Sequence, residues 1–492
     1  MASIYSRPES KGFDQTIQLI LAVLVGVALG TVSLVLSPLW TMVGIAGLVV
    51  VLVAVKWPEL SILAIIAALC TILPETQMPV INIGPGRLYM TEPIVIGLYV
   101  VVVVRWLVDR SFRLVRTPLD LPLILFYIWA IGSTIIAIMN ETVSPVSYIP
   151  EIRTVSYYLL FFLITNLIRK KGQVETLING FFFLATVVAV AMIYQYTLGT
   201  SVAFLSGRVE VLKTAGNVSS DVTRITDTSG EGILTLAFIL KSVILMTASV
   251  KVKRVPTLVQ WVLFGVAMVM SFNRTHWAVS GLIIVVTALM VRGEMQRRLV
   301  KWVLIFLYLI PLASLPFLVM PNSRAGKLVG AAVERVSSLI SEESYAESST
   351  TSTIRWRDFE YRYGFKEIQE QPVMGLGLGA EYRPSVFGID NEWFDGRGYT
   401  HNAHLWLAVK TGLVGYFLFM WLMILAIVRG LNRWRKVKDG HLSSVVLGIS
   451  LAFAGLIVAN ILHPMYMTLY WTPLLGVMFG LNEVIYRIEE IT

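Results

Sequence analysis

The chain has 492 residues, of which 56% are hydrophobic and only 14% are charged. Soluble globular domains carry about 25% charged residues, so this composition excludes them. The formal net charge is +9, but basic residues in a membrane protein mostly record helix orientation, so we expect no nucleic-acid partner. The expected fold is all-α, a polytopic helical bundle embedded in the lipid bilayer.

Apolar runs long enough to cross a hydrocarbon core of about 30 Å recur along the chain. Bounding each run by charged residues, proline or glycine predicts about 14 transmembrane helices, within a range of 12–14. The expected spans are 17–36, 40–55, 60–74, 91–108, 121–138, 150–168, 176–194, 233–250, 257–272, 277–291, 302–320, 404–428, 443–460 and 466–486. The single cysteine, Cys70, lies inside one run, which excludes a disulfide framework within one chain.

Lysine and arginine residues gather in alternate connections between these spans, for example at residues 169–171 and 429–438. Because translocating cations is disfavoured, these connections face the cytoplasm, and so do both termini. Residues 1–16 are typical of a cytoplasmic tail rather than a cleaved signal peptide. The predicted organisation is a bundle of about eleven helices over residues 1–320, one large external loop over 321–403, and about three C-terminal helices over 404–492.

The external loop contains two segments with helical spacing. Residues 327–340 predict an amphipathic helix resting on the bilayer surface. Residues 354–366 predict a second helix that stops before Pro372. The glycine run at 375–379 lacks the Lys-Ser/Thr of a phosphate-binding loop, so close backbone packing is the better explanation. A second outward connection, residues 196–231, is interpreted as a polar connector rather than a lid.

Because translocating cations is disfavoured, arginines in the outward-facing connections need an explanation and are candidate functional residues. Arg87 and Arg153 are explained either as interfacial side chains or as supporting ligand contacts. Arg274 lies in a tight outward turn, Ser271–Trp277, where a cation needs a partner.

The second loop helix is also rich in arginine, carrying Arg355, Arg357 and Arg362. A helix with a cationic stripe and aromatic sides fits a phosphate or sugar ligand. The alternative is an interfacial helix that contacts anionic lipid.

His401 and His404 lie where the external loop re-enters the membrane. Outside the membrane there is no ATP, so a reaction there needs a pre-activated substrate such as a lipid diphosphate-linked sugar. Its acceptor hydroxyl needs a base, for which His401 is the candidate, and its leaving diphosphate needs fixed cations, for which Arg274 and Arg355 are candidates. The alternatives for the histidines are a metal site, which lacks adjacent acidic residues at ligand spacing, and interfacial residues with no catalytic task. We expect no metal and no cofactor.

These residues fall in motifs of a known family. The run His401-Asn402-Ala403-His404-Leu405, with Gly412 and Gly415 on the next helix, resembles the signature of the O-antigen ligase and polymerase superfamily. Pro372-Val373-Met374-Gly375-Leu376-Gly377 and the pair Arg355-Trp356 resemble further motifs of that family. Ser271-Phe272-Asn273-Arg274 departs from its usual Ser-Arg pair. The motifs cover roughly residues 270–415.

The resemblance implies a metal-independent, inverting glycosyl transfer from an undecaprenyl diphosphate-linked saccharide at the outer face of the bacterial inner membrane. It assigns the catalytic histidine to His401 and the diphosphate-binding arginines to Arg274 and Arg355, while Asn402 positions the end of the loop and His404 is a further candidate ligand contact. We expect a polymerase of cell-surface polysaccharide that acts on a glycan or lipid acceptor, with other polysaccharide assembly proteins as further partners.

Two alternatives remain. A ligase would transfer the finished glycan to a lipid A core, a protein or a wall component. A transporter without chemistry would place ionisable residues near the bilayer midplane and show repeated halves, whereas the polar groups here gather in one outer loop.

Overall fold

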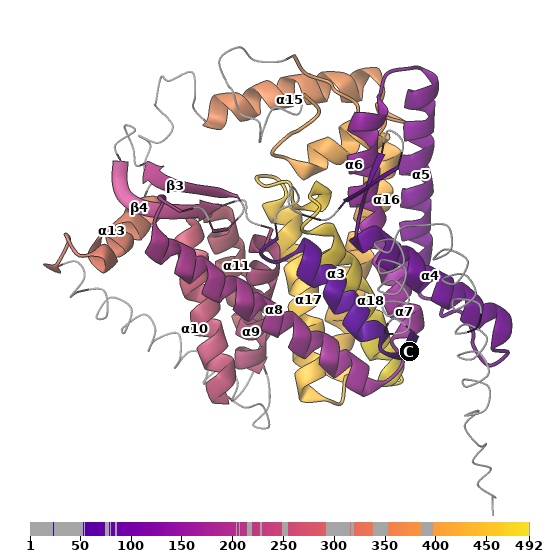
Figure 1. Cartoon of the computed structure of the whole chain (residues 1–492), viewed down its shortest axis with the longest axis horizontal. Helices are drawn as coiled ribbons and strands as arrows, with labels where there is room; N and C mark the ends of the chain where they lie inside the picture. The colour runs from indigo at the N-terminus through magenta and orange to yellow at the C-terminus, as the bar shows by residue number, and fades with distance from the viewer. Residues whose placement is uncertain are drawn as a thin grey trace, which may run out of the picture.

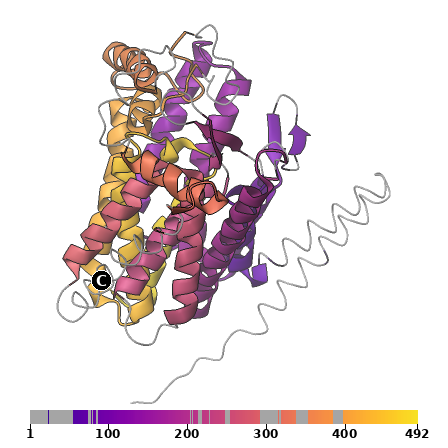
Figure 2. The same ribbon diagram turned by 90° about the vertical axis from the view of Figure 1, so that its left-hand side faces the viewer.

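The protein is a bundle of α-helices with further helices and strands gathered at one end (Figures 1 and 2). The computed structural model describes residues 23, 53, 55–73, 78, 80–83, 86–202, 204–205, 207–213, 219–226, 229–247, 254–291, 315, 319–337, 353–384 and 397–491. The described helices of the bundle are α3 (Pro58–Leu69), α4 (Thr91–Val108), α5 (Asp120–Met139), α6 (Pro145–Ser156), α7 (Leu160–Leu167), α8 (Lys171–Leu198), α9 (Glu231–Thr247), α10 (Arg254–Ser271), α11 (Arg274–Met290), α16 (Ala403–Arg433), α17 (Gly440–Ala459) and α18 (Thr472–Ile488).

Within the described residues, five helices are long and apolar enough to cross a membrane: α4, α5, α8, α17, and α16 continued to Lys436. Three shorter apolar helices, α3, α10 and α11, belong to the same bundle. These helices confirm a mainly helical, multi-pass membrane protein. The predicted spans 17–36, 40–55 and 302–320 lie almost wholly outside the described residues, so the number of about 14 spans stays a prediction.

Among the predicted spans that differ from the observed helices, 150–168 and 466–486 are interrupted by 3-10 turns. The span expected at 150–168 begins earlier, at Pro145, because Ser144 forms a capping box with Ser147, and the 3-10 turn η2 (Tyr157–Leu159) divides it. The span expected at 466–486 begins only at Thr472. Residues 460–471 form instead a loop with a 3-10 turn, η5 (Met465–Met467), and we call this segment the α17–α18 loop.

The all-α expectation missed two antiparallel β-hairpins in the described residues. They pair β1 (Val80–Ile83) with β2 (Gly86–Tyr89), and β3 (Arg208–Lys213) with β4 (Ser219–Thr226). The second hairpin lies in the connection 196–231, so the described part of this connection contains paired strands, and its role as connector or lid stays a prediction. The hairpin's alternation of polar and apolar residues is typical of strands, but short strands leave a weaker signal than the neighbouring helices.

Both expected helices of the external loop are present, as α13 (Arg324–Ser337) and α15 (Thr353–Glu370). Ala331 of α13 is buried against Phe272, in the turn between α10 and α11, and against Leu212 and Val222 of the second hairpin. One face of α13 thus packs on protein. Figure 1 shows α15 lying across one end of the bundle, far from the C-terminus.

Helix α16 is interrupted at Gly412, whose φ of 67° and ψ of 177° are not helical. The glycine run of the external loop, residues 375–379, packs into this break. Leu376 N donates to Val409 O at 2.9 Å, Gly377 N donates to Lys410 O at 2.9 Å, and Leu413 N donates to Pro372 O at 2.7 Å. The loop therefore bonds the carbonyls and the amide that the helix leaves unpaired. This confirms close backbone packing as the role of the glycine run.

A buried ion pair secures the same junction. The Lys410 side chain is 0% exposed, and its Nζ donates to Glu151 Oε1 of α6 at 2.9 Å and to Ala380 O at 2.5 Å. The second oxygen of Glu151 accepts from Gly379 N at 2.6 Å. One carboxylate thus joins α6, α16 and the external loop, and a buried charge of this kind requires such partners.

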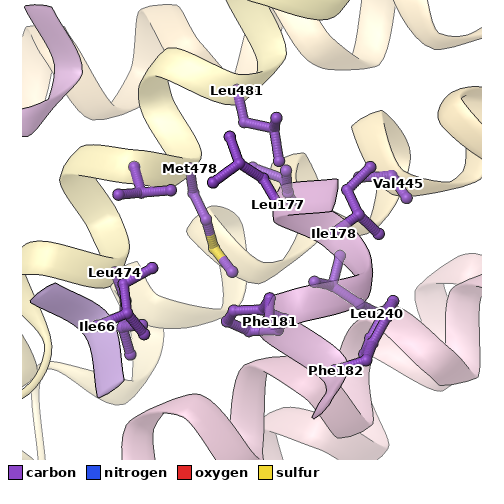
Figure 3. Close-up of a pocket in the computed structure, with 12 residues that line it drawn as sticks. Ile66, Leu177, Ile178, Phe181, Phe182, Leu240, Val445, Leu474, Met478 and Leu481 are labelled. Carbon is purple, nitrogen blue, oxygen red and sulfur yellow. The ribbon is translucent and has the colours of Figure 1, made fainter. Parts of the chain in front are cut away.

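An apolar pocket lies between helices of the bundle (Figure 3). Its lining comes from five helices, α3, α8, α9, α17 and α18, and includes Phe181, Leu240 and Met478. Because every lining side chain is apolar, this pocket offers no group for acid–base chemistry.

We predict that Gly375→Ala destabilises the protein by about 2 kcal/mol or more, because Gly375 has a φ of +69° and left-handed conformations cost a residue with a Cβ roughly 1–2 kcal/mol. The added Cβ would also lie 2.3 Å from Gly412 N. The matched control is Gly132→Ala in α5, where an added Cβ meets no atom within 4 Å. Thermal unfolding of the purified protein in detergent measures both, and equal melting temperatures for the two variants would contradict the prediction.

Candidate functional site

His401 lies directly before α16 and is paired with a buried carboxylate, Glu360 of α15. The distance from His401 Nδ1 to Glu360 Oε1 is 3.0 Å. Glu360 also accepts from His401 N at 2.9 Å and from Thr400 Oγ1 at 3.2 Å. The Glu360 side chain is 0% exposed, whereas that of His401 is 18% exposed.

The start of α16 explains why this pair forms. Asn402 is the N-cap residue, and its side-chain oxygen accepts from His404 N at 2.9 Å and from Leu405 N at 3.1 Å. Its side-chain amide donates to Tyr361 Oη of α15 at 3.3 Å. Asn402 therefore fixes the loop end, as expected, and ties it to the helix that carries Glu360.

Helix α15 is also held over the α17–α18 loop. Arg357 Nη2 donates to Leu462 O at 3.2 Å, and Tyr361 Oη donates to Ile461 O at 3.4 Å. The start of α16 bonds to the same loop, because Ala403 N donates to Asn460 O at 2.9 Å. Three segments far apart in sequence thus meet around His401.

The pair has the geometry of an oriented base. A carboxylate only accepts hydrogen bonds, so the proton of a neutral His401 sits on Nδ1 and the basic lone pair is on Nε2. The buried Glu360 then holds the ring orientation and stabilises the imidazolium that forms on proton uptake, as the acid does in a catalytic triad. This arrangement can take a proton from a hydroxyl group.

A second histidine–carboxylate pair lies close by, at the start of α9 and α11. His276 Nδ1 is 3.0 Å from Glu231 Oε1, and the two side chains are 1% and 6% exposed. Asn273, the N-cap residue of α11, donates to the same Glu231 oxygen at 3.0 Å.

His463 of the α17–α18 loop connects the two pairs. Its ring packs edge-on against His276, with centroids 5.2 Å apart. Burial lowers the pKa of His463 to about 3, and the nearby His276 acts in the same direction. His401 and Arg357 also lower this pKa, while Glu231 opposes them. His463 is therefore neutral at pH 7 and lies within electrostatic reach of both pairs.

The structure describes the side chain of only one of the two arginines expected to bind diphosphate. Arg274 is the first residue of α11, in the same turn as His276, and its side chain is half-buried. His276 in this turn packs on His463, and His401 lies within electrostatic reach of the same His463 ring. Arg355 belongs to α15, but its side chain lies outside the described residues. Convergence of all three groups on one ligand stays a prediction.

Arg153 and Arg87 are held in the fold at the first hairpin. Arg153 Nε donates to Glu92 Oε1 at 2.7 Å, its guanidinium lies over the Tyr89 ring at 4.1 Å, and it donates to the Arg87 carbonyl. Arg153 is thereby buried, whereas the Arg87 side chain is exposed. These contacts give Arg153 a structural role in joining α4, α6 and β2.

Two further expected ligand contacts also have protein partners. Arg362 pairs with Asp358 at 2.5 Å on an exposed face of α15. His404 Nε2 lies 2.8 Å from Ile457 O, so its ring bridges α16 and α17. Among the residues that the structure describes, no group of three or more His, Cys, Asp or Glu side chains is arranged to hold a metal ion.

Sequence reasoning missed Glu360, Glu231 and the position of His463. Glu360 shares the spacing i, i+3, i+4, i+7 with Arg357, Tyr361 and Gly364, the residues on the α15 face that meets α16 and the α17–α18 loop. That spacing was the available signal, but this face is polar and so escapes a search for apolar periodicity.

Part of the chain matches a known protein family. Residues 261–420 match the family model described as O-Antigen ligase. The matched segment begins in α10, includes α11 and the external loop, and ends within α16. It thus contains His276, Glu360 and His401, and it confirms the resemblance inferred from the sequence motifs. No curated protein matches the chain.

The depressed pKa of His463 predicts acid sensitivity. An unfolded histidine has a pKa of about 6.5, so between that pH and about 3 the unfolded chain binds a proton that the folded chain does not. The stability that neutral His463 supplies is complete above pH 6.5 and is lost as the pH falls. When the pH falls from 7 to 5, we expect the free energy of unfolding to drop by roughly 1–2 kcal/mol less in the His463→Gln variant than in the wild type. Thermal unfolding at both pH values tests this, and an equal loss in both proteins would refute it.

Proposed function

Because residues 261–420 carry a domain of the O-antigen ligase family, we propose that this membrane protein is a glycosyltransferase that polymerises repeat units of a bacterial cell-surface polysaccharide. The donor is an undecaprenyl diphosphate-linked saccharide, and the site faces the periplasm from the inner membrane. The observation that carries the proposal is the His401–Glu360 pair at 3.0 Å within the matched segment.

In the proposed reaction the acceptor hydroxyl oxygen attacks the anomeric carbon of the donor. The bond from that carbon to the phosphate oxygen breaks, and the diphosphate leaves with the electron pair. His401 Nε2 takes the proton of the hydroxyl group, while Glu360 stabilises the resulting imidazolium. A single displacement of this kind inverts the configuration at the anomeric carbon, and no step requires a metal ion.

The leaving diphosphate gains charge in the transition state and needs fixed positive groups. Arg274, at the positive N-terminal end of α11, and Arg355 of α15 are assigned this role. Arginine suits it because its guanidinium binds phosphate oxygens in pairs and stays charged.

A ligase that transfers finished glycan to lipid A core, protein or another acceptor is the second candidate, because the matched family model describes a ligase. A transporter is the third, and the oriented His401–Glu360 pair favours chemistry over it. Incubating the purified protein with lipid-linked repeat units alone separates the first two. Longer glycan chains support a polymerase, whereas product that appears only with a second acceptor supports a ligase.

We predict that His401→Ala lowers the rate of glycan transfer by about 10²–10⁴-fold, because a positioned base contributes that much. Glu360→Gln should lower kcat by roughly 10²-fold with a smaller change in KM, since an amide no longer stabilises the imidazolium. The matched control is His441→Ala at the opposite end of α17 from the α17–α18 loop. Transfer is measured by gel analysis of labelled product, and unchanged transfer in the His401 variant would exclude His401 as the base.

A further inference from the structure

The end of the bundle that the charge rule predicts to be cytoplasmic carries three arginines that the proposed reaction does not use. Arg429, Arg433 and Arg435 follow one another over the end of α16 and the 3-10 turn η4 (Trp434–Lys436). Tyr486, near the end of α18, lies beside them. Figure 1 shows the C-terminus, which follows α18 closely, at the opposite end of the bundle from α15. The three arginines therefore lie far from the proposed reaction site.

Within the described residues, only the first of these arginines is paired with an acid. Arg429 forms a two-point ion pair with Glu483 of α18, in which Nε lies 2.8 Å from Oε1 and Nη2 lies 2.7 Å from Oε2. The other acids at this end with recorded partners are Asp439, which accepts from Lys171 Nζ, and Glu489, which accepts from Lys438 N. Arg433 and Arg435 form no ion pair with a described carboxylate, so their positive charge is not balanced in this part of the chain.

Aromatic rings hold both of these unbalanced guanidinium groups in place. Arg433 Cζ lies over the Tyr486 ring at 5.6 Å, and Arg435 Cζ lies over the Trp434 ring at 4.9 Å. Arg435 Nη2 also donates to Met290 O at the end of α11, at 3.3 Å. Arg433 Nε is buried and has no hydrogen-bond acceptor among the described residues, while its side chain as a whole is only half-buried. Both planar groups are thus oriented before any ligand arrives.

The level of these arginines in the membrane favours a lipid headgroup as the ligand. Helix α16, continued to Lys436, is long and apolar enough to cross the bilayer, so its end lies near the headgroup phosphates. Ile424 and Val428, in the turns just before the arginines, are exposed apolar residues that suit acyl chains. The charge rule alone is met equally well by lysine, and it does not account for guanidinium groups seated on aromatic rings.

We propose that Arg433 and Arg435 form a binding site for the phosphate group of an anionic phospholipid in the predicted cytoplasmic leaflet. The phosphate oxygens accept hydrogen bonds from the guanidinium groups, and the acyl chains lie along α16 beside Val428. Because Tyr486 and Trp434 already fix the two planes, little side-chain freedom is lost on binding. The lipid thereby bridges the ends of α16, α18 and α11. This inference is independent of the proposed glycan transfer.

The test measures binding of phosphatidylglycerol to the full-length protein in a neutral detergent, by titration with native mass spectrometry. We expect Arg433→Gln to weaken binding by about tenfold or more, because charge-assisted hydrogen bonds to phosphate are lost. Arg433→Lys keeps the charge but loses the planar group, so it should weaken binding by about threefold or more. The matched control is Arg110→Gln, an exposed arginine after α4 at the same predicted face, which should bind as the wild type does.

Two further probes identify the source of the phosphate. Weaker binding of phosphatidylcholine, whose headgroup is zwitterionic, and of inorganic phosphate supports a site for an anionic lipid. Binding of either probe as tight as that of phosphatidylglycerol overturns the proposal, and so does wild-type affinity for phosphatidylglycerol in both Arg433 variants. If Arg433→Gln does not purify as a folded protein, Arg435→Gln decides in the same way, because the exposed Arg435 can be changed while Arg433 stays on Tyr486.

Discussion

The exchange of backbone hydrogen bonds at Gly412 is the constraint on which the described site depends. A helix interrupted in the membrane exposes polar groups that lipid cannot satisfy. Here the external loop satisfies them, and the Lys410–Glu151 pair locks the loop in place. The short first half of α16 that results begins at Ala403 and presents His401 at its head. Helix α16 and the loop segment 372–380 are therefore one structural unit.

That unit also helps to position Glu360, the buried partner of His401. Helix α15 precedes the glycine run directly, so fixing the run at α16 also fixes the helix that supplies Glu360. Arg357 and Tyr361 then hold α15 on the α17–α18 loop. That loop carries His463 to the start of α11. His401, Glu360 and His463 thus come together through contacts between the start of α16, α15, the α17–α18 loop and the start of α11.

Several parts of this structure could be predicted from sequence. Long apolar runs predicted α4 at its observed bounds, and Pro372 correctly indicated the end of α15, because both signals are local. The motif around His401 indicated a histidine that the structure pairs with the buried Glu360, and its catalytic role stays a prediction. The β-hairpins escaped prediction because their strands are short. The predicted number of spans is not tested, because three of the spans lie almost wholly outside the residues that the structure describes.

The partners of the site residues could not be predicted for a different reason. Glu360 and Glu231 are identified by what they contact across the fold, and no local pattern encodes a contact over 41 residues such as that between Glu360 and His401. Arg153 illustrates the same limit. Its place in an outward connection left open an interfacial side chain or a ligand contact, and neither interpretation indicated its contacts with Glu92 and the Arg87 carbonyl.

The buried Lys410 also has a consequence for biogenesis. A lysine entering the bilayer without a partner is strongly disfavoured during insertion. Glu151 lies on α6, which is synthesised before α16, so its carboxylate is already present when Lys410 is added to the chain. The contacts of residues 372–380 with α16 can form only after that late helix has been synthesised, so this junction is among the last parts of the fold to be completed.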